Sequence, residues 1–314
     1  MTKRSYAIIG TGAIGGFCAF KLQQAGFDVH CLLGHDYHQV KACGLSLIEQ
    51  NKTSIASVKA YNTPESMPQC DVIIIALKST SNHMLQHCIK NLIHKKSVVV
   101  VMQNGIGIEQ ELAQVIEPHH IIGGSCVFKV TKVAPGIVKH FGFSTIELAQ
   151  YYVDELCSEI SEATLQVAQD LKSAKIDATP YGHLPTIRWK KLIGNIPTSG
   201  LSVILNSAIT DLLTNASGLA LIKEVTKECI RAARQCGAQL PDDFYEFRLS
   251  LLEAIIKMER HNISMKDDFD AKKPLELAAI YKNPLAIAKK NNAPMPLTEM
   301  IYHQLLYLEA KNIK

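Results

Sequence analysis

The sequence predicts two domains, an α/β domain built on a largely parallel sheet followed by an all-α domain. Short β-rich runs alternate with helical stretches in the first half of the chain, which is typical of parallel α/β folds. Two of these runs, "CDVIIIALK" and "KSVVVVMQNG", are almost continuously apolar, as expected of central strands that are covered on both faces. From about residue 183 onward, helical patterns punctuated by glycine and proline replace the alternation.

The composition is that of an ordinary globular protein. The chain has 314 residues, of which 47% are hydrophobic and 20% are charged, and this length favours two cores over one. The basic residues behind its formal net charge of +4 are scattered, so we expect no nucleic-acid partner. No apolar run reaches the roughly 18 residues of a transmembrane helix, so we expect no membrane partner. Nine cysteines without metal-ligand spacing indicate reduced thiols in a cytoplasmic protein that binds no metal.

In the first domain, strands and helices are expected to alternate. The predicted parallel strands are Tyr6–Gly10, Phe27–Leu33, Cys70–Lys78 and Lys96–Gly105. The predicted helices run from about Ala13 to Ala25, where Gly26 stops the helix, and from Ser79 to His94. Between the second and third strands, "GLSLIE" and "SIASVKAY" alternate as an edge hairpin or a crossover would. The segment Ile121–Gln150 predicts antiparallel strands around a Pro135-Gly136 turn.

The second domain is expected to consist of helices alone. They are predicted at Thr186–Leu205, Ser217–Gln235, Asp242–Arg260, Leu275–Ile280 and Leu297–Ala310. The change of pattern near Tyr181–Leu184 places residues 1–182 in the first domain and residues 183–314 in the second.

A glycine motif at the first strand–helix junction indicates what the first domain binds. The segment "IIGTGAIGG" has glycines in GxGxxG spacing, directly after an apolar strand and at the start of a helix. In the dinucleotide-binding fingerprint, these glycines permit a tight turn, close approach of the backbone to a pyrophosphate, and close packing of helix and strand. We therefore predict a Rossmann-type dinucleotide-binding domain. Its predicted phosphate-binding residues are Gly10, Thr11, Gly12, Ala13, Ile14 and Gly15.

The end of the second strand leaves the choice of dinucleotide open. An acidic residue there would bind a ribose 2′-hydroxyl, whereas a basic residue would accept a 2′-phosphate. The discriminating position is Gly34, and Asp36 lies slightly late for the first role. His35, His38 and Lys41 could together serve the second role, or all four side chains could be solvated loop residues.

Two further residues follow predicted strands at the sheet edge where open α/β folds bind ligands. Lys78 ends "VIIIALK", and Asn104 lies in "MQNGIG". We expect Lys78 to contact the cofactor rather than to be a plain loop charge. Asn104 either serves the turn chemistry of Asn104-Gly105 or approaches the nicotinamide ribose.

The stretch "RWKKLIGNIPTSGLSVIL" predicts an apolar helix with a polar stripe. Lys191, Asn195 and Ser199 recur every four residues, and Ser202 follows, so these side chains share one helix face. The stripe is either a solvated face or the lining of a cleft in which Lys191 acts on a substrate. The second interpretation explains why a lysine stands among apolar residues.

Taken together, these segments resemble the ketopantoate reductases. The resemblance rests on "GTGAIGG", "ALKS", "QNGIG", "WKKLIGN", "NISMKDD" and "PLELAAIY", which span nearly the whole chain in the order of that family. The family consists of NADPH-dependent enzymes of pantothenate synthesis, with a Rossmann domain followed by a helical domain. The resemblance therefore implies reduction of 2-dehydropantoate to pantoate, with NADP as the cofactor.

The resemblance also implies roles for individual residues. Lys191 would be the catalytic lysine, and Glu276 the catalytic carboxylate that holds the substrate hydroxyl. The implied substrate-binding residues are Asn195, Ser199 and Ser264, and the implied cofactor contacts beyond the glycine loop are Lys78 and Asn104. These residue types suit the reaction, because an ammonium stabilises the oxyanion that forms during hydride transfer and can then supply a proton.

This chain departs from the family pattern at two positions. Ser199 stands where the family usually has a second asparagine, and Gly34 stands where it often has an arginine for the NADP phosphate. The first departure permits an alternative activity on another small 2-keto acid. A further alternative is a nicotinamide-nucleotide-binding regulator without turnover. The expected partner is a small-molecule substrate, and the protein could form a homodimer.

Overall fold

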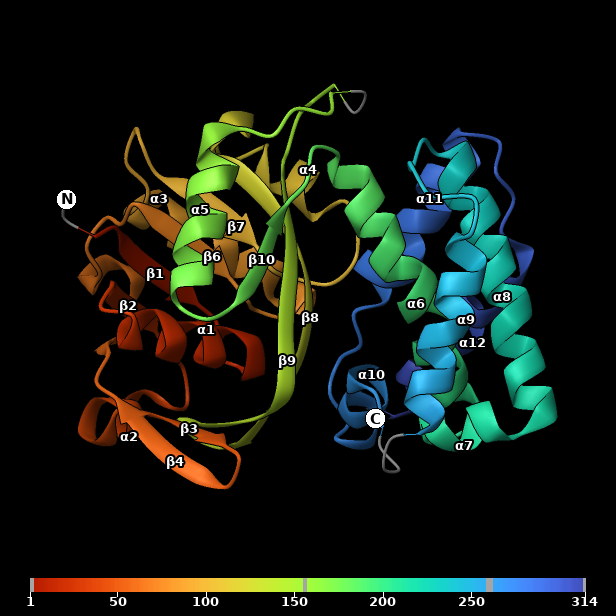
Figure 1. Cartoon of the computed structure of the whole chain (residues 1–314), viewed down its shortest axis with the longest axis horizontal. Helices are drawn as coiled ribbons and strands as arrows, with labels where there is room; N and C mark the ends of the chain where they lie inside the picture. Colours follow the sequence, from red (N-terminus) through yellow and green to blue (C-terminus); the bar gives the residue numbers. More distant parts are fainter. Residues whose placement is uncertain (1–2, 155–156, 258–261, 313–314) are drawn as a thin grey trace. The chain divides into compact units, whose positions relative to one another are not determined.

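The computed structural model describes residues 3–154, 157–257 and 262–312. The chain forms two compact units (Figure 1). Unit 1 comprises Met1–Gln103 and Ile108–Ile187, and unit 2 comprises Asn104–Gly107 and Arg188–Lys314. The units therefore divide a few residues after the predicted boundary. In addition, the loop Asn104–Gly107, which the sequence places in the first domain, belongs to the helical unit.

Unit 1 is built on one ten-stranded sheet with the order β4-β3-β9-β8-β7-β6-β1-β2-β5, and β10 pairs with β9. The strands are β1 (Ser5–Ile9), β2 (Asp28–Leu32), β3 (Leu45–Glu49), β4 (Lys52–Ala56), β5 (Lys59–Tyr61), β6 (Val72–Ile75), β7 (Val98–Val101), β8 (Ile121–Ala134), β9 (Ile137–Gln150) and β10 (Asp177–Pro180). Pairing is parallel from β5 through β2, β1, β6 and β7 to β8, whereas β8 and β9 are antiparallel.

The two apolar runs form the middle of this sheet, which confirms the predicted fold class. Every residue of "VIII" in β6 is buried, and β6 pairs in parallel register with β1 on one side and β7 on the other. The helices of unit 1 are α1 (Ala13–Gln24), α2 (Tyr37–Cys43), α3 (Leu85–Leu92), α4 (Ile108–Leu112) and α5 (Glu162–Ser173). Helices α1 and α5 lie on the same side of the sheet, and residues of both share one core with the strands (Figure 1).

Some elements of unit 1 differ from the prediction. The segments "GLSLIE" and "SIASVKAY" supply an antiparallel β3–β4 hairpin at one edge, but β5 pairs with β2 at the other edge. The predicted helix Ser79–His94 begins with the 3₁₀ turn η2 (Ser79–Met84) and becomes α-helical only at Leu85. Short polar side chains such as Ser79, Ser81 and Asn82 compete for backbone hydrogen bonds, and this disfavours a regular first turn.

Unit 2 consists of helices around its own core. They are α6 (Leu184–Ile204), whose first turn belongs to unit 1, α7 (Ile209–Thr214), α8 (Ala216–Gln235), α9 (Phe244–Ile256), α10 (Ser264–Asp270), η4 (Ala278–Lys282), α11 (Asn283–Lys290) and α12 (Pro296–Asn312). The core joins Trp189 and Ile196 of α6 to Tyr281 of η4 and Ile301 of α12.

The helical prediction missed three short helices and one irregularity. Helices α7, α10 and α11 were not expected, and the end of the predicted helix Asp242–Arg260 lies outside the described residues. The predicted helix Leu275–Ile280 is instead the π-helix η4, which continues directly into α11. Such π-helical turns are rare and are often found at functional sites.

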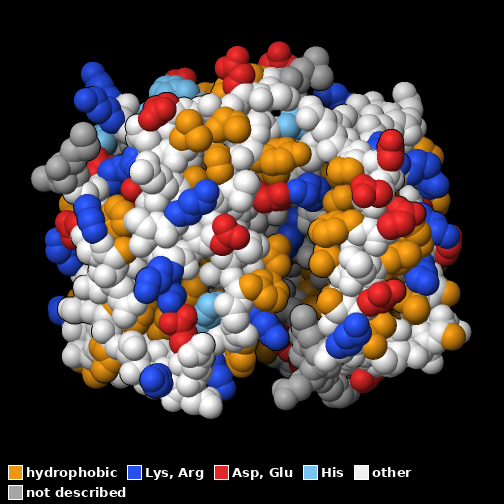
Figure 2. Space-filling model, viewed as in Figure 1, with side chains coloured by type: hydrophobic (Ala, Val, Ile, Leu, Met, Phe, Trp, Pro, Cys, Tyr) orange, Lys and Arg blue, Asp and Glu red, His pale blue; other side chains and the backbone are white. Residues whose placement is uncertain are grey.

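The surface carries mixed charge. On the face seen in Figure 2, Lys and Arg side chains are interspersed with Asp and Glu, without a continuous basic stripe. Over the described part of the chain, the helices are too short or too polar to cross a lipid bilayer. All nine cysteines carry free thiols.

Candidate active site

A pocket of about 720 Å³ opens in unit 1 where the first two parallel strands end. Residues Ile9–Gly12 begin at the last residue of β1, residues Leu32–Asp36 begin at the last residue of β2, and both segments line the pocket. This edge of an open parallel sheet is where such folds bind dinucleotides. The pocket therefore coincides with the site that the glycine motif predicts.

The three motif glycines are required for different reasons. Gly10 has φ +92°, and a Cβ there would lie 2.6 Å from the backbone nitrogen of Leu77. A Cβ on Gly15 would lie 2.0 Å from the Gly10 carbonyl oxygen. A Cβ on Gly12 would meet nothing within 4 Å. Gly10 and Gly15 thus serve packing, whereas Gly12 keeps open space at the beginning of α1.

The amino end of α1 suits a phosphate in that space. Gly12 precedes the helix without a side-chain cap, and the first turn holds no acidic residue. Backbone N–H groups at a helix start favour an anion when no side chain satisfies them. The residues present therefore fit a dinucleotide pyrophosphate.

We expect Gly12→Ala to weaken dinucleotide binding without weakening the fold. The added methyl group occupies the space where the backbone must approach a pyrophosphate. The dissociation constant for NADPH should rise about tenfold or more, which corresponds to about 1.4 kcal/mol. Fluorescence titration of the reduced nicotinamide measures this change, and urea unfolding of the cofactor-free protein should show little difference from the parent. Gly10→Ala is the contrasting variant, because its methyl group would strain the turn and lower the free energy of unfolding.

The pocket wall beyond β2 contains an ion pair. The Asp36 carboxylate is 5% exposed, and its Oδ2 accepts a hydrogen bond from the Gly136 backbone N–H at 3.0 Å and ion-pairs with Lys132 Nζ at 2.5 Å. Asp36 and Lys132 both line the pocket. A Cβ on Gly34 would meet nothing within 4 Å, so the discriminating position leaves open space beside this pair.

Sequence reasoning missed Lys132. It comes from β8, nearly a hundred residues after Asp36 along the chain, and its own segment "KVTKVA" is an ordinary strand pattern. His35 also lines the pocket, but His38 and Lys41 lie on α2 outside its described lining, and Lys41 Nζ donates to Tyr37 Oη at 2.9 Å. Lys78 precedes η2, next to Leu77 of the lining.

The loop that carries Asn104 is bound to the π-helix of unit 2. Ile106 N–H donates to the Ala279 carbonyl at 3.0 Å, and Asn283 Nδ2 donates to the Ile106 carbonyl at 2.8 Å. Gly105 has φ +101°, and a Cβ there would lie 2.4 Å from the Ala279 Cβ. Close approach of the two backbones therefore requires glycine at this position.

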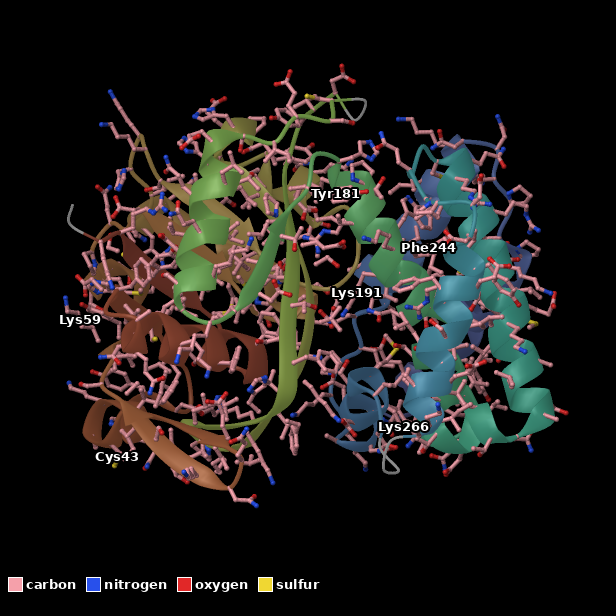
Figure 3. All side chains as sticks on the ribbon, in the orientation of Figure 1. Cys43, Lys59, Tyr181, Lys191, Phe244 and Lys266 are labelled. Carbon is pink, nitrogen blue, oxygen red and sulfur yellow. The ribbon has the colours of Figure 1, made fainter. Side chains whose placement is uncertain are left out.

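Helix α6 presents the predicted stripe from half-buried and buried positions. Lys191, labelled in Figure 3, and Asn195 are half-buried, whereas Ser199 is only 6% exposed. Ser202 is fully buried, and its Oγ has no hydrogen-bond partner among the described residues. The stripe is therefore not a freely solvated face.

Tyr281 joins α6 to the π-helix. Its hydroxyl donates to the Ile196 carbonyl at 2.8 Å, and burial raises its pKa well above the usual value, which keeps it a donor. A Cβ on Gly200 would lie 2.7 Å from Tyr281 Oη, so glycine on α6 allows this contact. Pro197, which has no N–H to donate, lies inside the same helix.

These contacts connect the segments of several predicted site residues within unit 2. Glu276, 5% exposed, lies two residues before the π-helical segment, and its backbone carbonyl accepts the Ile280 N–H at 3.1 Å. Through Ala279 and Tyr281, the segment of Glu276 is fixed both to the loop of Asn104 and to α6. Ser264 is exposed at the start of α10, and no hydrogen bond of its side chain joins it to the other described site residues.

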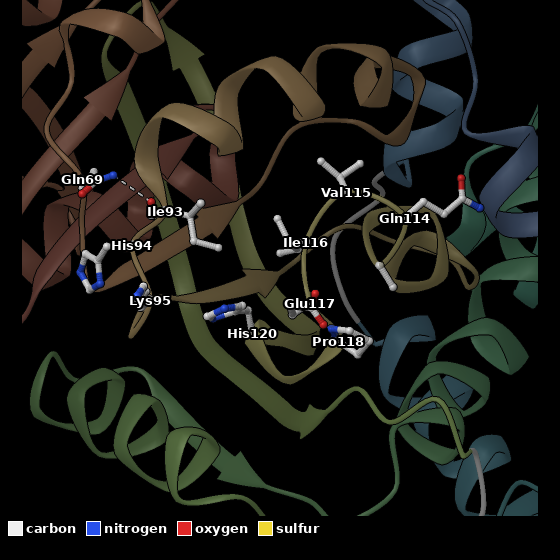
Figure 4. Close-up of a pocket in the computed structure, with 11 residues that line it drawn as sticks. Gln69, Ile93, His94, Lys95, Gln114, Val115, Ile116, Glu117, Pro118 and His120 are labelled. Atoms are coloured by element: carbon white, nitrogen blue, oxygen red, sulfur yellow. Dashed lines mark hydrogen bonds between the residues drawn. The ribbon is translucent and has the colours of Figure 1, made fainter.

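A second pocket, of about 670 Å³, lies at the amino ends of β6, β7 and β8 (Figure 4). Gln69 donates to the Ile93 carbonyl at 3.0 Å within it, and His120 Nδ1 lies 2.5 Å from the Ser97 carbonyl oxygen. Ligands of open α/β sheets bind at the opposite, carboxyl ends. The glycine-motif pocket is thus the better candidate for the cofactor.

The fold and the glycine-motif pocket are those of a two-domain dinucleotide-binding protein. The family model described as "Ketopantoate reductase PanE/ApbA" matches residues 6–152, and that described as "Ketopantoate reductase PanE/ApbA C terminal" matches residues 184–309. The chain belongs to the ketopantoate reductase family, which confirms the resemblance inferred from its motifs.

Two relatives agree with this assignment, and a third protein shares the fold. A 2-dehydropantoate 2-reductase of Nostoc sp. is 38% identical over 314 residues, covering 99% of this chain and 97% of that protein. The crystal structure of 2-dehydropantoate 2-reductase from Geobacter metallireducens has a TM-score of 0.90 at 29% identity, covering 96% of this chain and 99% of that one. A D-mandelate dehydrogenase solved with NADH and anilino(oxo)acetate shares the fold, with a TM-score of 0.87 at 21% identity, covering 98% and 99%.

Proposed function

We propose that the protein reduces 2-dehydropantoate (ketopantoate) to pantoate with NADPH. The observation that carries this proposal is the grouping of the Asn104 loop, Glu276 and the α6 stripe within one unit by the bonds of Ala279 and Tyr281. The relative from Nostoc sp., which matches over nearly the whole chain, supports the same reaction.

The residues of this chain would divide the chemistry among them. When bound, the reduced nicotinamide supplies a hydride to the C2 carbonyl carbon. Lys191 would stabilise the negative charge that grows on the carbonyl oxygen and then donate an Nζ proton to it, which yields the hydroxyl. Glu276 would accept a hydrogen bond from the hydroxyl group of ketopantoate. Lys78 and Asn104 would contact the cofactor.

Neutral side chains would orient the rest of the substrate. Asn195, Ser199 and Ser264 can donate to or accept from its polar groups without adding a buried charge. Ser199 is shorter than the asparagine that the family usually has, so a bridging water would complete its contact.

The test is loss of reduced-nicotinamide absorbance with ketopantoate, using NADPH and NADH in parallel. We expect oxidation that depends on ketopantoate and is faster with NADPH. Oxidation with another 2-keto acid but not with ketopantoate would assign the protein to a different substrate. Binding of NADPH without oxidation in the presence of any 2-keto acid would instead indicate a regulator.

Lys132 supports the preference for NADPH. It is the one lysine or arginine among the described residues that line the pocket, and its ion pair with Asp36 neutralises the carboxylate that would otherwise repel a phosphate. We therefore propose that Lys132 binds the 2′-phosphate, in place of the arginine that Gly34 replaces.

Lys132→Ala is expected to reverse the cofactor preference. The dissociation constant for NADPH should rise about ten- to a hundredfold, the range for a lost charged hydrogen bond. The constant for NADH should stay unchanged or fall, because Asp36 becomes available to the ribose hydroxyl. Lys41→Ala, on α2, is the matched control and should leave both constants unchanged. Equal weakening of NADPH and NADH by Lys132→Ala would refute the assignment.

We also propose a cytoplasmic homodimer. A dimeric ketopantoate reductase from Staphylococcus aureus shares the fold, with a TM-score of 0.81 at 19% identity. On α12, Met300 and Tyr307 are each more than half exposed, and exposed apolar side chains of this kind support association. Sedimentation equilibrium of the purified protein measures its mass in solution.

A further inference from the structure

An arginine of unit 2 packs directly against helix α6. Arg248 belongs to α9, one turn after Phe244, which Figure 3 labels together with Lys191. A Cβ on Gly194 of α6 would lie 2.6 Å from Arg248 Nη2 and 3.1 Å from Arg248 Cζ. The guanidinium group therefore lies over Gly194 in space that any other residue would fill.

The half-buried Arg248 side chain has no anion beside it among the described residues. Within residues 3–154, 157–257 and 262–312, its side chain makes no ion pair or hydrogen bond, and its Nε is buried without a partner. Burial also lowers its pKa, and no nearby carboxylate opposes that shift. In contrast, the buried Lys266 pairs with Asp270, and Lys21 pairs with Glu49. Buried cations are normally paired in this way.

The position of Gly194 places this guanidinium beside the predicted catalytic stripe. Residues three apart on a helix are neighbours on its surface, so Gly194 adjoins Lys191. All of these residues belong to unit 2.

A cation beside the predicted stripe would suit the carboxylate of the proposed substrate. A 2-keto acid carries a carboxylate next to its keto group, and Lys191 is assigned to the keto oxygen. Asn195 and Ser199 are neutral, and Glu276 is an acid. A guanidinium binds a carboxylate through two parallel hydrogen bonds, which fixes its orientation. Resting on the proposed function, we infer that Arg248 binds the substrate carboxylate and so selects 2-keto acids over neutral ketones.

The experiment compares ketopantoate with its primary amide as substrates of Arg248→Gln. We expect kcat/KM for ketopantoate to fall about ten- to a hundredfold, mainly through KM, because a contact made equally in ground and transition states changes KM. The amide has no carboxylate, so its kcat/KM should change little. The variant should thus lose the preference for the acid.

Three further measurements separate this role from a structural one. Arg248→Lys keeps the charge but not the paired hydrogen bonds, so it should retain an intermediate preference for the acid, and it serves as the test if Arg248→Gln does not fold. Arg231→Gln on α8, an exposed arginine of the same unit, is the matched control and should match the parent. Calorimetric binding of pantoate to the NADP-bound protein should weaken for Arg248→Gln in parallel with KM.

The outcomes also separate this inference from the proposed function. Equal losses on the acid and the amide, with weaker thermal stability, would show that Arg248 only supports α6 and would overturn the inference alone. If the parent protein reduces no 2-keto acid but binds NADPH, the proposed function fails and the inference fails with it.

Discussion

Replacing Lys191 with alanine is expected to lower kcat/KM for ketopantoate by roughly 30- to 1000-fold, a loss of about 2 to 4 kcal/mol in transition-state stabilisation. The ammonium is the donor proposed for the oxyanion, and it stands half-buried on α6, where partial exclusion of water strengthens the interaction. Its neighbours Asn195 and Ser199 can donate hydrogen bonds, but neither can supply the proton at neutral pH.

Lys190→Ala is the matched control for this variant. Lys190 precedes Lys191 in the same helix but points about 100° away around it, so its removal should leave turnover close to that of the parent. Steady-state rates with saturating NADPH measure both variants, and NADPH affinity should stay unchanged, because the predicted phosphate-binding residues lie in the Gly10–Gly15 loop. Near-parental turnover of Lys191→Ala would show that the assigned mechanism is wrong.

Gly105→Ala is expected to destabilise the protein by about 2 to 5 kcal/mol and to reduce activity with it. The alanine would have to adopt φ +101° while its Cβ lies 2.4 Å from the Ala279 Cβ and 2.5 Å from the Ala279 carbonyl oxygen. The loop would have to leave η4, which breaks the Ile106–Ala279 hydrogen bond and displaces Asn104. Urea unfolding measures the change in stability.

Gly142→Ala separates backbone strain from the clash. Gly142 in β9 also has a positive φ, +145°, but a Cβ there would meet nothing within 4 Å. This variant should therefore show only the conformational part of the cost. If Gly105→Ala and Gly142→Ala destabilise the protein equally, close packing of the loop on η4 is not what Gly105 provides.

Much of the fold could be predicted because it depends on local patterns. The runs around Val72–Ile75 and Val98–Val101 read as buried parallel strands, and a glycine loop after an apolar strand has few other uses. The missed features depend on contacts between distant segments. The π-helix at Ala278–Lys282 packs on the Gly105 loop and on α6. The spacing of residues in "PLELAAIY" does not predict these contacts.

The residues of the candidate site also fall into those that a local pattern predicts and those that depend on contacts between distant segments. Lys191 and Asn195 could be paired from their helical spacing alone, whereas the roles of Glu276 and Ser264 come only from family resemblance and stay predictions. No sequence pattern around Lys132 or Arg248 predicts a role in a binding site. Lys132 reaches the pocket through its pairing with Asp36, and Arg248 reaches α6 through the absence of a side chain at Gly194.

The Asp36–Lys132 pair has an evolutionary consequence. Adapting a nucleotide pocket to the other coenzyme ordinarily requires a new group to be gained as well as an old one lost. Here Asp36 and Lys132 already line the same pocket, and each neutralises the charge of the other. With the role proposed for Lys132, a descendant lineage would exchange one coenzyme for the other by a single substitution, the loss of Lys132.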